Sequence, residues 1–203
     1  MSNPSKHDQI KDYYKEDGLT YLERRWQDTP VARFDYKMTR EALLGVLKGK
    51  KYEKILEIGP GPGTWTPIFA GICESLTLVD ISDTMLDIAK NRLKEHEITF
   101  HLGDFMELRF EEKFDLIIAV RSFEYFEEKE KFIHKCNNIL SDGGEIILVT
   151  KTKGSIWYGK SKIRDLLWEI SPELFKYEQT NARGGKAQIF WQERMFVRQT
   201  KSI

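Results

Sequence analysis

Residues 55–66, with the sequence Ile-Leu-Glu-Ile-Gly-Pro-Gly-Pro-Gly-Thr-Trp-Thr, constrain the possible folds more than any other stretch of the chain. Glycine weakens helices and strands and proline lacks a backbone donor, so neither a stable helix nor a central strand can contain this run. A short apolar segment typical of a buried strand precedes it. The stretch therefore predicts a stiff, open turn that leads from a strand into a helix near Thr64 and lets a ligand approach the backbone.

Four more apolar segments of strand length follow, and helical patterns separate them. The segments do not alternate between polar and apolar residues, which favours burial on both faces of a parallel sheet. The strands are expected at residues 75–80, 98–104, 114–120 and 144–150, and the helices at residues 39–49, 64–74, 82–97 and 127–140. Repeated strand–helix–strand units predict an α/β fold with a doubly wound, mostly parallel, Rossmann-like sheet in a three-layer sandwich.

The length of 203 residues predicts a single domain with additions. We expect a helical N-terminal lid region at residues 1–50, a core at residues 51–151 and a C-terminal extension of the same domain at residues 152–203. Basic and acidic residues balance at 32 each, which gives no overall attraction to nucleic acid or to an anionic membrane. The excess of bases in residues 151–203 indicates either a solvated face or the flank of a site for an anionic substrate.

The two cysteines, Cys73 and Cys136, form no Cys-x-x-Cys pair, and both are expected in helical segments. This usage predicts buried free thiols in a reducing compartment, without a disulfide or a metal site. The N-terminus lacks the apolar core of a signal peptide, and the sequence contains no apolar run of the length that spans a bilayer. Together these features predict a cytoplasmic protein.

The glycine spacing does not fit the dinucleotide fingerprint Gly-x-Gly-x-x-Gly, because threonine stands where the third glycine belongs. The pattern is instead Glu57-x-Gly59-x-Gly61-x-Gly63, followed by an acid, Asp80, at the end of the second strand. With the segments His-Leu-Gly-Asp-Phe, Phe-Asp-Leu-Ile-Ile-Ala-Val and Gly-Glu-Ile-Ile-Leu-Val-Thr in the same order, residues 52–150 resemble the class I S-adenosylmethionine-dependent methyltransferases. The similarity is to the small-molecule type that includes enzymes of ubiquinone and menaquinone biosynthesis.

The resemblance implies a cofactor site on the loops that follow the first strands. In this family the glycine loop wraps the methionine and ribose, the acid after the second strand accepts the ribose hydroxyls, and the acid after the third binds the adenine amino group. The residues implied to bind cofactor are Glu57, Gly59, Pro60, Gly61, Gly63, Thr64, Asp80, Ile81, Met85, Asp104, Phe105, Arg121 and, in the N-terminal lid, Tyr14 and Arg33. Asp80 as a helix cap, Asp104 as a turn acid and Met85 as a core residue stay open as alternatives.

The implied activity is transfer of a methyl group from S-adenosyl-L-methionine to a small-molecule acceptor by in-line displacement, with S-adenosyl-L-homocysteine as product. No catalytic residue is predicted, because the methyl group is already activated and a base is needed only for an acceptor that holds its proton tightly. The substrate-side residues, Tyr125, Phe126, Trp157 and Tyr158, are typical of a pocket for an apolar or aromatic acceptor.

Three other functions stay open. An RNA methyltransferase would explain the basic tail, although net neutrality argues against nucleic acid; a nicotinamide-dependent oxidoreductase and a non-catalytic cofactor-binding protein would share the fold. The tail also departs from the family, because its usual sixth and seventh strands are not recognisable. Two alternatives stay open: the sheet is shortened, or residues 187–199 supply an irregular substitute, as one bent strand or two short ones.

Overall fold

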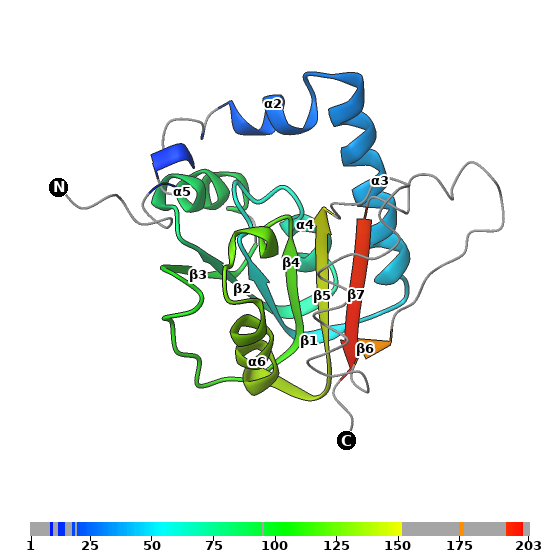
Figure 1. The fold of residues 1–203 in the computed structure, drawn as a ribbon, viewed down its shortest axis with the longest axis vertical. Coiled ribbons are helices and arrows are strands. Elements are labelled where there is room, and N and C mark those ends of the chain that lie inside the picture. Colours follow the sequence, from blue (N-terminus) through cyan, green and yellow to red (C-terminus); the bar gives the residue numbers. More distant parts are fainter. Residues whose placement is uncertain are drawn as a thin grey trace. The chain divides into compact units, whose positions relative to one another are not determined.

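The computed structural model describes residues 9, 12–14, 18, 20–94, 96–151, 175–176 and 194–200. The chain divides into two compact units, Met1–Leu108 and Arg109–Ile203. Figure 1 shows the helices and strands of both units, coloured along the sequence. The expected division at residues 50 and 151 stays a prediction.

Three parallel strands in the order β3-β2-β1 form the sheet of the first unit. They are β1 (Tyr52–Ile58), β2 (Cys73–Asp80) and β3 (Ile98–Leu102). Ile58 pairs with Val79 and Asp80 pairs with Leu102, so the carboxyl ends of all three strands meet at one edge. The last four residues of β1 and the last five of β2 are buried, as expected for a sheet covered on both faces.

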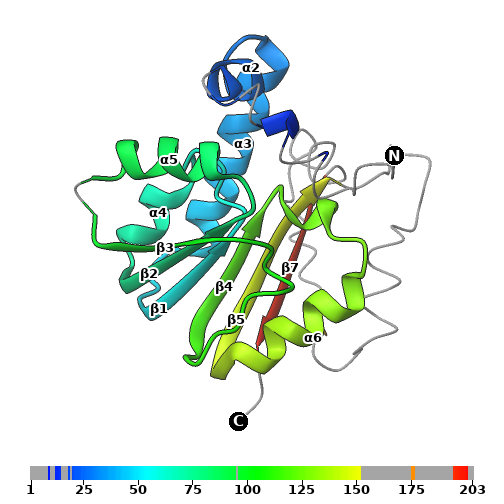
Figure 2. The ribbon, with the colours of Figure 1, turned by 90° about the vertical axis from the view of Figure 1, so that its left-hand side faces the viewer.

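The first unit has four described helices, and two of them begin at a residue whose side chain caps the helix. They are α2 (Tyr21–Trp26), α3 (Pro30–Val46), α4 (Thr66–Ala70) and α5 (Asp83–Arg92). Thr29 caps α3 by accepting a hydrogen bond from the backbone of Ala32, and Ser82 caps α5 in the same way. Both α4 and α5 contact β2, and they lie along the same face of β1–β3 (Figure 2).

Two expectations about the first unit are wrong. The helix expected from residue 39 begins at Pro30, because Thr29 followed by proline is the true start signal. Thr39 lies inside α3, where its hydroxyl donates to the carbonyl of Asp35. Cys73 lies in β2 rather than in a helix, because α4 ends before Gly71 and the strand begins two residues later.

The second unit has four strands in the order β4-β5-β7-β6. They are β4 (Phe114–Val120), β5 (Leu140–Lys151), β6 (Phe175–Lys176) and β7 (Arg194–Thr200). The first two are parallel, whereas β7 runs antiparallel beside β5, and β6 antiparallel to β7 (Figure 1). A short 3-10 helix, η1 (Phe123–Tyr125), follows β4, and helix α6 (Lys129–Ile139) contacts β5.

The end of α6 differs from the expectation. The Ser-Asp-Gly-Gly run at residues 141–144 was expected as a turn, but it lies within β5, whose pairing with β4 shifts register between Phe114 and Leu116. Such an irregularity accommodates extra residues without ending the strand. Strand β7 supplies part of the substitute expected at residues 187–199, and the rest of that segment lies outside the described residues.

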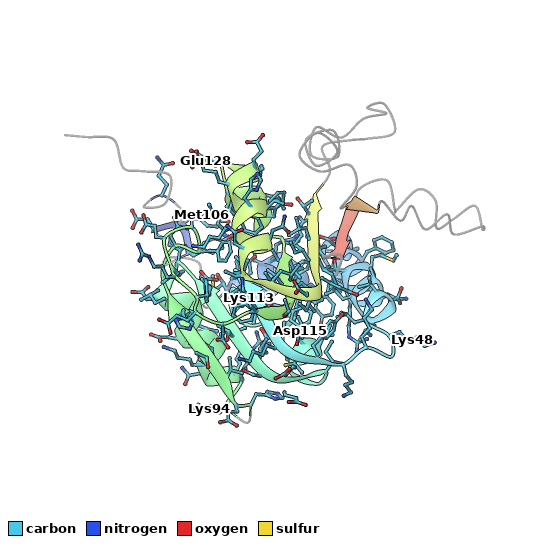
Figure 3. The ribbon with its side chains drawn as sticks, turned by 90° about the horizontal axis from the view of Figure 1, so that it is seen from below. Lys48, Lys94, Met106, Lys113, Asp115 and Glu128 are labelled. Carbon is cyan, nitrogen blue, oxygen red and sulfur yellow. The ribbon has the colours of Figure 1, made fainter. Side chains whose placement is uncertain are left out.

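Apolar side chains form the buried core of each unit, and most charged side chains lie on the surface. Phe69, Leu78 and Leu86 belong to the core of the first unit and Ile133 and Leu148 to that of the second. Charged side chains such as Lys48 and Lys94 extend from the surface (Figure 3). None of the described helices is long and apolar enough to cross a membrane, and the described residues contain no acidic, histidine or cysteine group suited to a metal ion.

Candidate cofactor site

The glycine-proline turn after β1 has an alternating backbone. Gly59, Gly61 and Gly63 have φ angles of 68°, 55° and 72°, which are left-handed values that glycine adopts at low cost. Pro60 and Pro62 stand between them and fix their own φ near −65°. The turn is closed by a hydrogen bond from the backbone N–H of Gly63 to the carbonyl of Pro60 (3.1 Å). The expected stiff, open turn is therefore present.

Asp80, the last residue of β2, connects the turn to the start of α5. Its Oδ2 accepts from the backbone N–H of Gly61 (3.0 Å) and its Oδ1 from the N–H of Ser82 (2.9 Å). The carboxyl group is largely buried, and this burial raises its pKa to about 6 although the backbone donors oppose the shift. Ser82, not Asp80, is the cap of α5, which excludes that alternative for Asp80.

Glu57 lies one residue before the end of β1 and is 1% exposed. The hydroxyl of Thr66, the first residue of α4, donates to its Oε2 at 2.7 Å. Burial raises the pKa of Glu57 to about 8, since one hydroxyl donor does not replace the lost water and Asp80 adds unfavourable negative charge. Burial in this site therefore favours the protonated form of the Glu57 carboxyl group.

Residues at the C-terminal end of helix α5 contact the turn. The Arg92 side chain donates from Nη1 to the carbonyl of Pro62 (2.8 Å). A methyl group added at Gly63 would lie 2.9 Å from Cδ1 of Leu93, closer than side chains pack. At Gly61, in contrast, no non-adjacent atom of the described residues lies within 4 Å of that position. The turn is packed on one side and open at Gly61.

The residues expected around adenine occupy different environments. The Oδ1 of Asp104 accepts from the backbone of Met106 (2.8 Å), so Asp104 does form the local turn that was the alternative reading. Met85 and Phe105 are 1% and 2% exposed and are packed as core residues, whereas Ile81 is half-buried. Their contacts with a cofactor stay predictions.

The N-terminal residues expected near the cofactor make local contacts. The ring of Tyr14 lies edge-on to Tyr13 and Tyr21, at centroid distances of 5.1 and 5.5 Å. Arg33 is exposed and donates from Nη1 to the carbonyl of Gln27. Their roles toward a ligand stay predictions.

The residue after β4 has a strained backbone. Arg121 is the non-glycine residue with a positive φ, 63°, in the described part of the chain, and its N–H donates to the carbonyl of Val149 (2.7 Å). Its side chain is 8% exposed and lies 3.8 Å from the carboxylate of Glu124. Strain of this kind often occurs where a structure holds a side chain for function.

The residues expected on the substrate side are described only in part. Tyr125 lies in η1 and is 39% exposed. The ring of Phe126 packs against the ring of Phe132 in α6, with the ring centroids 4.5 Å apart. Trp157 and Tyr158 lie outside the described residues.

Four residues that shape the turn were not predicted from the sequence. Thr66 binds Glu57, Arg92 binds Pro62, the N–H of Ser82 binds Asp80, and the indole of Trp65 is 3% exposed within the unit. A buried acid such as Glu57 predicts that a hydrogen-bond donor lies near. The donor to Glu57 is 9 residues away in the sequence and the donor to Pro62 is 30 residues away, so hydrophobic periodicity does not reveal either of them.

Comparisons with known proteins identify the domain. Residues 55–144 match the family model of the methyltransferase domain. The chain is 29% identical over 141 residues to a malonyl-[acyl-carrier protein] O-methyltransferase of Bacillus cereus, covering 64% of this chain and 52% of that protein. It is 33% identical over 108 residues to a demethylmenaquinone methyltransferase of Tropheryma whipplei, covering 52% of this chain and 44% of that protein. The chain thus spans about half the length of the curated relatives it matches.

A solved structure has the same fold as the described part of this chain. The N-methyltransferase NodS from Bradyrhizobium japonicum, in complex with S-adenosyl-L-homocysteine, superposes with a TM-score of 0.71 at 19% identity and covers 98% of this chain and 99% of its own. The α/β fold class with a mostly parallel, Rossmann-like sheet is confirmed. The resemblance inferred from the sequence is likewise confirmed for residues 55–144, which match the methyltransferase domain, and the fold is that of a solved methyltransferase complex with S-adenosyl-L-homocysteine.

Proposed function

We propose that this protein transfers a methyl group from S-adenosyl-L-methionine to a small-molecule acceptor. The observation that carries the proposal is the arrangement of Asp80 against the open turn, with each carboxylate oxygen held by one backbone N–H. A carboxylate has about four acceptor positions, so both oxygens retain capacity for a vicinal diol such as that of ribose.

The residues of the turn fit the rest of such a cofactor. When bound, S-adenosylmethionine supplies a methyl group that its positively charged sulfur has already activated. The open position at Gly61 lets a ligand approach the backbone. The Thr64 hydroxyl is buried and has no hydrogen-bond partner among the described residues, which leaves it available to a polar ligand group.

The electrostatics of the site suit a cationic ligand. Glu57 and Asp80 both have raised pKa values because burial penalises their charged forms. A cation nearby favours ionisation of an acid, so the negative charge of Asp80 and proton release from Glu57 would together compensate a positive ligand. The protein's own part in the reaction is then binding, orientation and exclusion of water.

The acceptor is proposed to be a small apolar or aromatic molecule, and the cytoplasm to be the site of the reaction. Support comes from the relatives named for malonyl-[acyl-carrier protein] and demethylmenaquinone, and from the aromatic residues Tyr125 and Phe126 after β4. The free thiols of Cys73 and Cys136 favour a reducing compartment. The basic tail keeps RNA as the second candidate acceptor.

Calorimetry with S-adenosyl-L-homocysteine tests the cofactor site. Asp80→Asn replaces one acceptor oxygen with an amide donor, which can bind neither the Gly61 N–H nor a hydroxyl proton at that position, so we expect affinity to fall at least about tenfold. Asp83→Asn, an exposed acid at the start of α5, is the matched control and should bind within about twofold of the wild type. An Asp80→Asn variant with unchanged affinity removes this residue from the site.

A methyl-labelling experiment tests the acceptor class. Wild-type protein, Asp80→Asn and labelled methyl donor are incubated with a small-molecule extract and, separately, with total RNA. Label that enters the small-molecule fraction only with wild-type protein supports the proposal. Label that enters RNA and is released by ribonuclease supports the second candidate.

A further inference from the structure

Three aromatic rings gather around Trp65, two residues after the glycine-proline turn. The indole of Trp65 stacks on the ring of Tyr36, with centroids 5.0 Å apart and an interplanar angle of 21°. It also meets the indole of Trp26 edge-on at 5.1 Å, and Trp26 lies 6.0 Å from Tyr36. We call these three residues the indole cluster.

The cluster joins the N-terminal helices to the turn. Trp26 ends α2, Tyr36 lies in α3, and Trp65 directly precedes α4. Trp26 is 4% exposed and Trp65 is 3% exposed, so the contact is buried on both sides. A further contact fixes α2 against α3, since the Arg25 guanidinium lies 3.9 Å from the centroid of the Trp26 ring and donates to Asp35 at 3.0 Å.

The two neighbours of Trp65 are the polar residues of the turn. On one side, the hydroxyl of Thr66 donates to Glu57. On the other, the Oγ1 of Thr64 is buried and has no hydrogen-bond partner in the part of the chain that the structure describes. Trp65 contacts both other rings of the cluster, and its backbone is continuous with that of Thr64 and Thr66. The free hydroxyl is the feature that points to a ligand.

We propose that Trp26 and Tyr36 are positioning residues for the cofactor. They hold Trp65, and through it they fix the Thr64 hydroxyl and the Thr66–Glu57 pair in the geometry that binds the ligand. This inference rests on the proposed function and extends it, because it makes cofactor affinity depend on two helices that precede the methyltransferase domain match at residues 55–144. The N-terminal segment then acts on the cofactor through Trp65.

Replacement of the Trp26 and Tyr36 rings tests the role of the indole cluster in cofactor binding. Trp26→Leu and Tyr36→Leu should each weaken binding of S-adenosyl-L-homocysteine about tenfold, measured by calorimetry on the full chain, because the Thr64 hydroxyl loses its fixed direction. Trp26→Phe and Tyr36→Phe retain a ring and should bind within about threefold of the wild type. Phe110→Leu, which removes a ring that packs on Phe114 in the second unit, is the control and should leave the affinity unchanged.

A double-mutant cycle separates positioning from general stabilisation. Thr64→Val removes the hydroxyl and should by itself weaken binding about tenfold. If Trp26 acts through that hydroxyl, the double variant Trp26→Leu/Thr64→Val should lose about tenfold as well, not about a hundredfold. Circular dichroism and the unfolding midpoint, measured on every variant, identify the temperature at which all remain folded for the binding measurement.

Several results would overturn the inference. Three outcomes would each contradict a role through Thr64: losses that multiply in the double variant, unchanged affinity in both leucine variants, or an equal loss of affinity in Phe110→Leu. Wild-type protein that binds no S-adenosyl-L-homocysteine would contradict the proposed function and this inference together, whereas normal wild-type binding with unaltered leucine variants contradicts the inference alone.

Discussion

The buried carboxyl group of Glu57 is the residue whose charge state most affects this unit. It is 1% exposed, accepts a hydrogen bond from the Thr66 hydroxyl and lies within the electrostatic influence of Asp80. Burial without a neighbouring cation favours the neutral form. The folded chain therefore holds this proton at a pH where the unfolded chain releases it.

We predict that the folded protein loses stability as the pH rises. The pKa of Glu57 is about 8 in the folded chain against an ordinary 4.5, so the folded state binds more protons between these values. The contribution of this group is complete below pH 4.5 and is lost as the pH rises to about 8, at up to about 1.4 kcal/mol per pH unit. Denaturant unfolding of the ligand-free chain at several pH values between 5 and 8 measures the slope.

Glu57→Gln keeps the shape and the acceptor for Thr66 but cannot ionise, so its free energy of unfolding should vary less with pH. Glu53→Gln, at the exposed start of the same strand, is the control and should keep the wild-type slope. A Glu57→Gln variant with the wild-type slope would show that another group carries the pH dependence. Asp80, with a pKa of about 6, is the group to examine next.

At the scale of elements, the turn after β1 and helix α5 behave as one structural piece. Arg92 donates to Pro62, Leu93 packs beside Gly63, and Asp80 links the turn to the first residues of α5. One side of the turn is thus filled by protein and the other is open at Gly61. This division separates the effects of two otherwise similar substitutions.

We predict that Gly63→Ala mainly lowers the free energy of unfolding, whereas Gly61→Ala mainly lowers the affinity for S-adenosyl-L-homocysteine. Both place alanine at a positive φ, which costs about 1–2 kcal/mol. Gly63→Ala adds a contact of 2.9 Å with Leu93, so it should lower the free energy of unfolding further, by roughly 1–3 kcal/mol. Gly61→Ala meets open space and should instead show the larger loss of S-adenosyl-L-homocysteine affinity.

Chemical denaturation and calorimetry on the two variants make the comparison. Equal losses of affinity with equal losses of stability would contradict the division of the turn into a packed side and a ligand side.

The sequence predicted the existence of elements better than their limits. Strand β4 was expected at its observed residues, because a continuous apolar run with polar flanks has clear ends. The start of α3 was missed, since Thr29 and Pro30 lie before any apolar periodicity. Strand β5 was expected four residues too late, because its register shift places glycines where a turn was the ordinary interpretation.

At the scale of the whole molecule, ligand binding and stability are linked. A ligand that binds only the folded chain stabilises it by about 2.7 kcal/mol at a free concentration one hundred times its dissociation constant. For a chain of this length we predict that S-adenosyl-L-homocysteine at that concentration raises the unfolding midpoint by about 5–11 °C.

Differential scanning fluorimetry measures the shift. Asp80→Asn at the same ligand concentration should show a much smaller rise, and Asp83→Asn should match the wild type. A rise in Asp80→Asn equal to that of the wild type would mean that the ligand stabilises the protein from another place.

The candidate site was predictable where it depends on sequence order and not where it depends on long-range packing. The positions of the glycine turn and of Asp80 follow from strands whose carboxyl ends meet at one edge, which the apolar runs already indicate. The indole cluster was not predictable, because Trp26, Tyr36 and Trp65 come together only when α2 and α3 pack beside the turn. Within residues 1–50, Tyr14 and Arg33 were predicted from the sequence as cofactor residues, and Trp26 and Tyr36 were not.

The alternation of left-handed glycines with prolines at residues 59–63 has a consequence for how this loop can change in length. Removal of one residue would shift a proline into a position that requires a positive φ, which its ring forbids. Removal or insertion of a Gly-Pro pair leaves every glycine at a position with positive φ and every proline at a position with negative φ. Among chains that share this turn, lengths should therefore differ by two residues and not by one.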